Sequence, residues 1–317
     1  MFFFYDKIGD EMGSNITNYR LQDIPSYYDW VTIKQVNKGW SKDKKYYIRN
    51  SSGEKFLLRI SDFNTYHSKR KEFETMKEVY KLGITMSAPV NFGICGDGKY
   101  VYLLLSWIDG TAVNEAIQTF SNKEQYKFGI EAGNILKKFH SVPAPLEQQD
   151  WEQRMIKRFN NHFEKYEDCG IKVANDNLAV QYIQNNLHLL KNRPQTCQHG
   201  DFHIGNLILA PDNTLGVIDF NRWDYGDPFE EFYKMMLFSR ELSIPFAKGQ
   251  INGYFKNRVP NNFFDLLALY LADVILFSVV WAIPFGTDEV KGMIKRAEMV
   301  LSDYDNFNTT TPKWFTE

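Results

Sequence analysis

Cysteine is scarce in this sequence. Its 317 residues include three cysteines, Cys95, Cys169 and Cys197. No two of them form a C-x-x-C pair, and an odd number cannot make a fully paired disulfide framework. Disulfide scaffolds and cysteine-rich zinc sites are therefore excluded as the basis of the fold. We expect a protein of the reducing cytoplasm.

The sequence also lacks an excess of charge of either sign. The sequence has 37 Lys and Arg residues and 39 Asp and Glu residues, which gives a net charge of −2 and a pI near 6.3. This balance argues against a general binder of nucleic acid or of anionic membranes. Met1–Tyr5 is apolar, but Asp6 and Lys7 end it too early for a signal-peptide core. We interpret residues 1–20 as a flexible arm.

One long apolar run interrupts this polar background, from Leu266 to Ile283. Its length approaches that of a membrane span. Asp273 lies at its middle, where a charge is costly in lipid, and Pro284 and Gly286 end it. We interpret the run as a buried helix of a large helical domain, with a membrane helix as the alternative.

The order of the remaining patterns predicts two parts. Strand patterns dominate up to Trp107, around one helical pattern at Tyr66–Leu82. Helical patterns dominate afterwards, apart from a short strand pair at Leu207–Leu209 and Leu215–Ile218. The segment Ile108-Asp109-Gly110 breaks the pattern between the two parts. We therefore divide the chain into residues 1–107 and residues 108–317.

The strongest chemical signal is His199-Gly-Asp-Phe-His-Ile-Gly-Asn206, followed by Val217-Ile-Asp-Phe-Asn221. Phosphoryl transfer needs a carboxylate that accepts the proton of the attacking hydroxyl, and oxygen ligands that hold magnesium against the phosphates. Asp201 can be the catalytic base. Asn206 and Asp219 can be the metal ligands, because the short strand pair carries them at its outer ends. The order of these parts is the order found in protein kinases.

With these residues, and with Gly226-Asp-Pro228 and Glu231, the chain resembles the aminoglycoside phosphotransferase and choline kinase-like group. This group is the small-molecule branch of the protein-kinase-like fold. Protein kinases usually have Arg at Gly200 and Gly at Asn221, and the small-molecule branch often lacks both. The resemblance extends from about Val31 to the final helices. It implies an α+β fold of two lobes, a small N-terminal lobe with an antiparallel sheet and a large, mostly helical C-terminal lobe.

The resemblance also implies a nucleotide site. Its covering loop falls at Asn37–Ser41, which has one glycine and no G-x-G-x-x-G; Gly39 and Ser41 would bring N–H groups to phosphate, although a plain hairpin turn fits the local sequence equally well. Arg59 stands where kinases place a phosphate-binding lysine, with Lys55 as its rival. The further residues that the resemblance assigns to this site are Glu72 as the first choice of ion-pair partner for Arg59, Glu74 as the second choice, and Ser106 and Ile108 at the hinge.

Two residues are expected to support the catalytic loop. The resemblance gives His199 a structural role rather than a catalytic one. Glu231 would brace the loop from a helix, where related proteins commonly carry Asp, so the longer side chain puts this contact in question. His203 is interpreted as a solvated loop residue.

The acceptor site is predicted from acidic residues of the C-terminal part. Asp224, Glu230 and Asp273 are our candidate substrate residues, because an acidic, aromatic-lined pocket suits a cationic amine. The alternative is that the acidic stretch after Asp219 caps and braces helices. On this alternative, the face that carries Asp273 belongs to the core, together with Tyr270, Phe277 and Trp281.

Together these features predict a Mg-dependent small-molecule kinase that uses ATP or GTP. An aminoglycoside-type antibiotic, and hence antibiotic resistance, is the favoured acceptor class. A metabolic amino alcohol or sugar derivative is the alternative acceptor, and a non-catalytic nucleotide-binding regulatory protein is the alternative function. We expect a monomer or a homodimer, with no nucleic acid or membrane partner.

Overall fold

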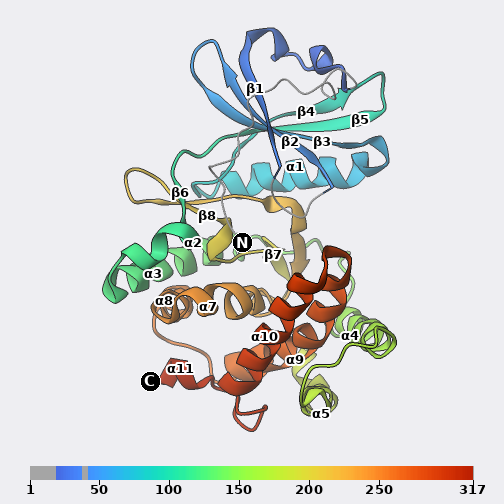
Figure 1. Ribbon diagram of the computed structural model, residues 1–317, viewed down its shortest axis with the longest axis vertical. Helices are drawn as coiled ribbons and strands as arrows, with labels where there is room; N and C mark the ends of the chain where they lie inside the picture. The colour runs from blue at the N-terminus through green and yellow to red at the C-terminus, as the bar shows by residue number, and fades with distance from the viewer. Residues whose placement is uncertain (1–18, 38–41, 317) are drawn as a thin grey trace. The chain divides into compact units, whose positions relative to one another are not determined.

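The computed structural model describes residues 19–37 and 42–316. The chain forms two compact units (Figure 1). The first contains the described residues up to Ala116 together with Gly205–Trp223. The second contains Ile117–Ile204 and the described residues from Asp224 onward.

A five-stranded antiparallel sheet forms the framework of the first unit. Its order is β1-β2-β3-β5-β4, and α1 (Tyr66–Tyr80) connects β3 to β4. The strands are β1 (Trp30–Val36), β2 (Lys44–Asn50), β3 (Lys55–Asp62), β4 (Pro89–Cys95) and β5 (Tyr100–Ser106). Gly53 makes the turn between β2 and β3 at φ +88°, a backbone conformation that favours glycine.

Alternation along these strands separates a core face from a second face. Successive side chains of a strand point to opposite sides of the sheet. On one side a hydrophobic core forms, whose buried members include Tyr46, Ile48, Leu58, Ile60 and Leu104. Because Lys45, Leu57 and Arg59 alternate with these residues, they point to the other side.

A small sheet of order β6-β8-β9 completes the first unit. Its strands are β6 (Thr111–Ala112), which precedes the short helix α2 (Val113–Ala116), β8 (Leu207–Leu209) and β9 (Leu215–Val217). Val217 also forms a parallel bridge with Met86. This pairing is why Gly205–Trp223 belongs with the N-terminal strands, although it comes much later in the sequence. The compact units thus differ from the predicted division at residues 107 and 108, which remains a prediction about domains.

The second unit is mostly helical. Its longer helices are α3 (Asn122–Phe139), α4 (Trp151–Asp168), α5 (Asp176–Asn186), α8 (Ile244–Phe255), α9 (Phe263–Ala282) and α10 (Thr287–Asp303), and its short ones are α6 (Phe232–Lys234), α7 (Arg240–Leu242) and α11 (Lys313–Thr316). Helix α3 begins with a capping box between Ser121 and Glu124. A two-stranded ribbon of β7 (Thr196–Gln198) and β10 (Asp224–Gly226) was not predicted, because its short strands lie far apart in the sequence and no turn joins them as one joins β8 to β9.

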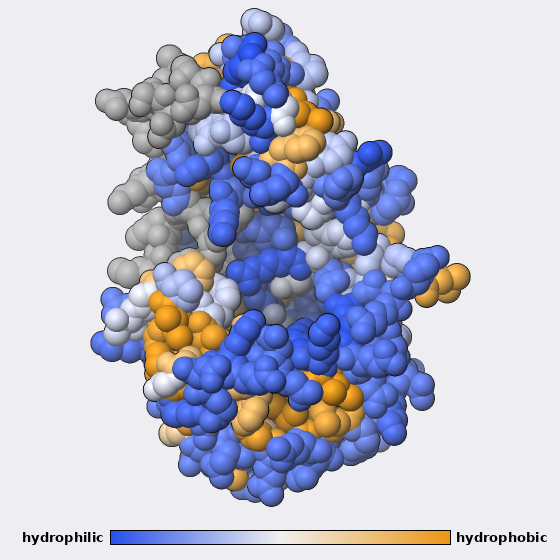
Figure 2. All heavy atoms as spheres, turned by 90° about the vertical axis from the view of Figure 1, so that its right-hand side faces the viewer, coloured by the Kyte–Doolittle hydropathy of each residue, from blue (hydrophilic) through white to orange (hydrophobic). Residues whose placement is uncertain are grey.

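Helix α9 contains the long apolar run. Residues Phe263–Phe285 are long and apolar enough to cross a membrane by length and composition, with a mean hydropathy of 2.3. Most of α9 is buried within the second unit, where it packs against α4, α5 and α10. Hydrophilic side chains cover much of the face in Figure 2, and apolar side chains gather there in separate patches. The prediction of a buried helix is confirmed.

Candidate functional site

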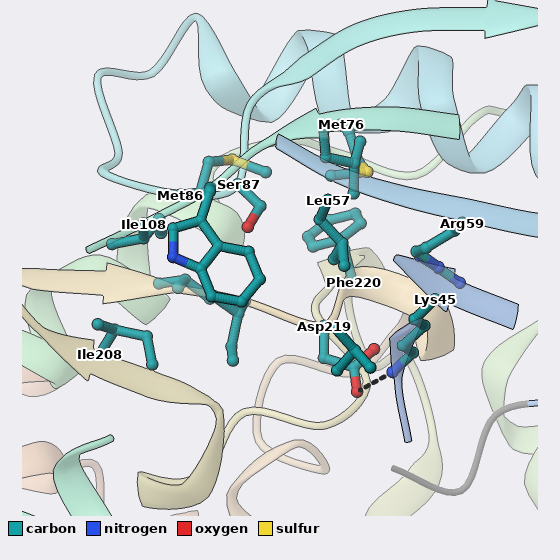
Figure 3. Close-up of a pocket in the computed structure, with 15 residues that line it drawn as sticks. Lys45, Leu57, Arg59, Met76, Met86, Ser87, Ile108, Ile208, Asp219 and Phe220 are labelled. Carbon is teal, nitrogen blue, oxygen red and sulfur yellow. Dashed lines mark ion pairs between the residues drawn. The ribbon is translucent and has the colours of Figure 1, made fainter. Parts of the chain in front are cut away.

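A pocket lies in the first unit, on the side of the sheet that faces away from its core. Its wall is largely apolar and includes Val36, Leu57, Met76, Met86, Ile108 and Ile208. Lys45, Arg59 and Asp219 also line it. In Figure 3 these charged residues lie at one end, and Met86, Ile108 and Ile208 lie at the other. An apolar slot with a charged end suits a flat ring that carries a charged group.

The hinge segment forms one edge of this pocket. Ile108, one of the two residues predicted to contact nucleotide at the hinge, lies in the wall. Ser106 ends β5, and its Oγ accepts a hydrogen bond of 2.8 Å from the backbone N–H of Ala88. Ser106 is therefore placed beside the pocket by a bond to the backbone before β4. Gly39 and Ser41 lie outside the described residues.

Arg59 is at the centre of a buried ion-pair network. Its side chain is 1% exposed. Nη1 donates to Glu72 Oε1 at 2.6 Å, and Nε donates to Asp43 Oδ2 at 3.0 Å. Lys69 joins from α1, with Nζ 2.7 Å from Asp43 Oδ2 and 3.3 Å from Glu72 Oε2. Sequence reasoning missed Asp43 and Lys69, because only the folded sheet brings them beside Arg59.

The electrostatics of this network fix its charges. Burial alone would lower the pKa of Arg59, but the carboxylates of Glu72 and Asp43 outweigh it and raise that pKa. Burial would likewise raise the pKa of Asp43, but Arg59 and Lys69 hold it well below its usual range. Arg59 is therefore charged and fully partnered.

Glu74, the second choice of partner for Arg59, and Lys55, the rival of Arg59, form other ion pairs. Glu74 is exposed and pairs with Lys77 at 3.1 Å, so the contact with Arg59 is made by Glu72. Lys55 pairs with Asp109 at 2.8 Å, and both side chains are exposed. The structure thus places Lys55 away from the charged end of the pocket.

Lys45 is a cation of the pocket that sequence reasoning did not select. It lies on β2 directly opposite Arg59 on β3. Its side chain is 8% exposed, and Nζ lies 3.5 Å from Asp219 Oδ2, as Figure 3 shows. The available signal was its place within the strand patterns before Trp107. Its position on the same side of the sheet as Arg59 follows from the register of β2 and β3.

Asn206 and Asp219 lie at the open end of the β8–β9 hairpin. At this end, away from the connecting turn, Leu207 pairs with Val217, and the N–H of Ile218 donates to the carbonyl of Asn206 at 3.0 Å. Asp219 has a left-handed backbone (φ 64°, ψ 58°), which redirects the chain directly after the strand. The two metal-ligand candidates are thus brought to neighbouring positions.

The donor set at this hairpin end fits magnesium. Among the described residues, no group of three or more His, Cys, Asp and Glu side chains could hold a metal ion. Mg²⁺ does not require such a group, because it commonly binds one or two carboxylates and completes its shell with water and substrate phosphates. A carboxylate from Asp219 and an amide oxygen from Asn206 supply hard oxygen ligands of this kind.

Asp201 belongs to the second unit and is paired with a cation. Lys234 Nζ of α6 lies 2.8 Å from Asp201 Oδ1, and the Lys234 side chain is 9% exposed. His203 Nε2 lies 3.9 Å from Asp201 Oδ2. Sequence reasoning did not predict the contact with Lys234, which lies 33 positions further along the chain.

Glu231 supports the loop that carries Asp201 through hydrogen bonds to its backbone. Its carboxylate accepts hydrogen bonds from the backbone N–H groups of His199 (3.1 Å) and Gly200 (2.6 Å). His140 holds the same carboxylate at 2.9 Å. The longer Glu side chain therefore reaches the loop. His199 is fully buried, and its Nδ1 accepts from the N–H of Asp201 at 3.2 Å.

The three candidate substrate carboxylates all have partners within the second unit. Asp224 pairs with Arg154 at 2.6 Å, and Glu230 pairs with Arg158 at 2.8 Å. Asp273 is 3% exposed and lies 2.9 Å from His162 Nδ1. The neighbouring Tyr270 is buried and donates to Asp227 at 2.6 Å. These contacts agree with the alternative interpretation, in which the acidic residues brace the helices of the second unit instead of binding a substrate.

Comparison with known sequences gives two matches. A model of the phosphotransferase enzyme family matches residues 32–265. Acyl-CoA dehydrogenase family member 10 of Mus musculus is 24% identical over 237 residues, which are 69% of this chain and 21% of that protein. The chain thus spans about a fifth of the length of this curated relative.

Several solved structures share the fold. A choline/ethanolamine kinase family protein from Mesorhizobium loti has a TM-score of 0.66 at 14% identity, covering 92% of this chain and 96% of that one. A thermostable mutant of aminoglycoside phosphotransferase APH(4)-Ia, in a ternary complex with ADP and hygromycin B, has a TM-score of 0.64 at 14% identity, with coverages of 89% and 97%. The amicoumacin kinase hAmiN, in complex with AMP-PNP, Ca²⁺ and Ami, has a TM-score of 0.59 at 13% identity, with coverages of 94% and 97%. The α+β, protein-kinase-like fold expected from the sequence is confirmed.

Proposed function

Because the chain belongs to the phosphotransferase enzyme family, we propose that it transfers the γ-phosphoryl group of ATP or GTP to a hydroxyl of a small molecule. One observation carries this proposal. Asn206 and Asp219 lie together at the open end of the β8–β9 hairpin, and Asp219 lines an apolar pocket of the same unit. An oxygen-ligand pair beside a slot for a flat ring is what a magnesium nucleotide requires.

The residues then have separate roles in the reaction. The apolar wall of the pocket holds the base of the nucleotide, and the charged end faces its phosphates. Asn206 and Asp219 would hold Mg²⁺, which supplies charge neutralisation at the phosphates. Asp201 accepts the proton of the acceptor hydroxyl while the oxygen–phosphorus bond forms and the bond to the nucleoside diphosphate breaks. Glu231 and His140 keep the loop that carries Asp201 in place.

The acceptor class is the finer part of this proposal. We favour a cationic acceptor of the aminoglycoside type, because solved relatives of this fold include a complex with hygromycin B and a choline/ethanolamine kinase family protein. A metabolic amino alcohol or sugar derivative is the second candidate. Asp224, Glu230 and Asp273 give this choice no further support, since each is already paired with a cationic or imidazole side chain. We place the protein in the cytoplasm on the basis of its free cysteines.

The test of the reaction is Asp201→Asn. We expect turnover to fall by about 10²–10⁴-fold while nucleotide affinity stays within twofold, because the base acts on the acceptor and not on the phosphates. Asp168→Asn is the matched control, since Asp168 is an exposed residue at the end of α4 and its substitution should leave turnover unchanged. Full activity of purified Asp201→Asn would refute the assignment.

A nucleotide-consumption screen against aminoglycosides, macrolides, amino alcohols and sugars would define the acceptor. Cationic acceptors should dominate among the hits. Hits restricted to neutral or anionic alcohols would overturn the cationic class and leave the phosphotransferase proposal intact. Tight nucleotide binding with no turnover on any acceptor would instead favour the non-catalytic alternative.

A further inference from the structure

Lys45 and Arg59 line the charged end of the pocket, and Lys69 joins Arg59 in its ion-pair network. The three cations differ in what their donor groups already bind. Arg59 donates from Nε, Nη1 and Nη2 to Asp43 and Glu72. Lys69 donates to the same two carboxylates. Lys45 lies in an ion pair with Asp219 at 3.5 Å, which is longer than a hydrogen bond between nitrogen and oxygen.

The hydrogen bonds of Arg59 to Asp43 and Glu72 argue against a role of Arg59 in binding phosphate. Its side chain is 1% exposed, and those of Glu72 and Asp43 are 4% and 8% exposed. If Arg59 turned toward a ligand, it would leave two buried carboxylates without their main partner, and an uncompensated buried charge is strongly destabilising. Arg59 therefore acts as the structural centre of the network.

Lys45 has the opposite properties. It lines the pocket, and within the described part of the chain its ammonium group donates no hydrogen bond. It lies opposite Arg59 on the neighbouring strand, so its side chain leaves the sheet on the same side, one strand away. An ammonium group binds phosphate as a compact point charge with three donors, and it needs no fixed approach direction.

We propose that Lys45 on β2, and not Arg59 on β3, is the cation that contacts the phosphates of the bound nucleotide. A single cation on β3 could both pair with the carboxylate of α1 and contact the phosphates. In this protein these two tasks are divided between β3 and β2. Arg59 fixes α1 to the sheet through Glu72, and Lys45 supplies the positive charge to the ligand. This inference rests on the proposed nucleotide-binding function and assigns a residue within that site.

The test compares nucleotide binding by Lys45→Met with binding by the wild type. Calorimetry with AMP-PNP, ADP and adenosine, each with and without Mg²⁺, measures how the effect grows with the number of phosphates. We expect Lys45→Met to weaken AMP-PNP binding by about 10–100-fold, as for the loss of a charge-assisted hydrogen bond, and to leave adenosine binding within twofold. Lys45→Arg should restore most of the AMP-PNP affinity.

Lys44→Met is the matched control. Lys44 is the exposed neighbour on the same strand, and its side chain points to the other side of the sheet. It should bind all three ligands like the wild type. If Lys45→Met is insoluble, Lys45→Arg, which retains the positive charge, and Lys45→Gln, which removes it but keeps a polar end, provide the same comparison of charge.

The outcomes separate this proposal from the function on which it rests. If Lys45→Met binds AMP-PNP as tightly as the wild type does, or if it loses equal affinity for AMP-PNP and adenosine, the role of Lys45 is overturned. The proposed nucleotide-binding function would survive either result. A wild-type protein that binds none of the three ligands would overturn the nucleotide function, and the assignment of Lys45 with it. A loss confined to phosphate-bearing ligands and repaired by Lys45→Arg supports the proposal.

Discussion

Lys234 Nζ lies 2.8 Å from Asp201 Oδ1, so the proposed catalytic base forms a direct ion pair with a buried cation of α6. Charge-assisted hydrogen bonds of this length are short and directional. The pair therefore holds one oxygen of the carboxylate in a fixed orientation. Because both residues belong to the second unit, this orientation is set within that unit.

Removal of this cation should reduce turnover without affecting the nucleotide. We expect Lys234→Met to lower kcat by about 10–100-fold, which corresponds to the loss of one charge-assisted contact, with little change in the nucleotide KM. Lys234→Arg should recover part of the loss. Lys295→Met, at an exposed position of α10, is the control and should behave like the wild type. An effect on nucleotide KM as large as that on kcat would contradict the role at Asp201.

The metal-ligand candidates can be tested at the β8–β9 hairpin. Asp219→Asn removes the negative charge and tolerates the left-handed backbone at this position, which Ala does less well. We expect it to raise the Mg²⁺ concentration needed for half-maximal activity more than Asn206→Ala does, because Asp219 contributes a full charge. Mg²⁺ titration at saturating nucleotide measures this.

The same hairpin offers a control at its other end. Asp212 lies in the exposed turn between β8 and β9, where it accepts hydrogen bonds from Thr214. Asp212→Asn retains an acceptor oxygen and should leave the Mg²⁺ requirement unchanged. An unchanged requirement in Asp219→Asn would remove Asp219 from the metal site.

Arg59 should matter for stability more than for ligand affinity. Arg59→Met removes one of the two cations that hold the buried carboxylates of Asp43 and Glu72, so we expect a loss of about 3–5 kcal/mol in the free energy of unfolding. Arg59→Lys should lose less, because it retains the charge. Urea denaturation followed by far-UV circular dichroism measures both, with Arg49→Met at an exposed position of β2 as the control. A stable Arg59→Met with impaired phosphate binding would instead make Arg59 the ligand cation.

The three cysteines should react at different rates. Burial raises the pKa of Cys95 to about 12 and that of Cys197 to about 12, so neither thiol is ionised near neutral pH. Cys169 is only partly buried. At pH 8 we expect Ellman's reagent to label one thiol of the native protein rapidly, and all three after unfolding. Cys169→Ser should abolish the rapid phase; rapid labelling of Cys95 or Cys197 would show that its surroundings open readily.

Local pattern was sufficient for most of the fold. The strands of the first unit and the buried helix with Asp273 were both predicted, because each depends on residues close together in the sequence. The two short strands β7 and β10 were missed. Their residues, such as Cys197 and Tyr225, pair across 28 positions and have no signal of their own.

The partners of the charged residues were harder to predict than the residues themselves. The resemblance implied Glu72 as the first choice of ion-pair partner for Arg59 and Glu74 as the second, and the structure has the pair with Glu72 at 2.6 Å. It did not indicate that Asp43 and Lys69 complete the network, or that Lys45 faces Asp219. Ion pairs between distant elements depend on strand register and on helix orientation, and a single sequence contains neither.

The sequence by itself determined where the candidate catalytic and metal-binding residues stand along the chain. The spacing of Asp201, Asn206 and Asp219 around a short strand pair is a local property, because a tight loop and a hairpin bring such residues to their positions over a few bonds. Only the tertiary structure decided which charges remain available to a ligand. Asp224, Glu230 and Asp273 looked available in the sequence and are closely paired in the fold. Lys45 was not selected from the sequence, but it lines the pocket and has a longer contact of 3.5 Å with Asp219. The physical reason is that a charge is neutralised by whatever the fold places within a few ångströms of it, and those neighbours come from distant parts of the chain.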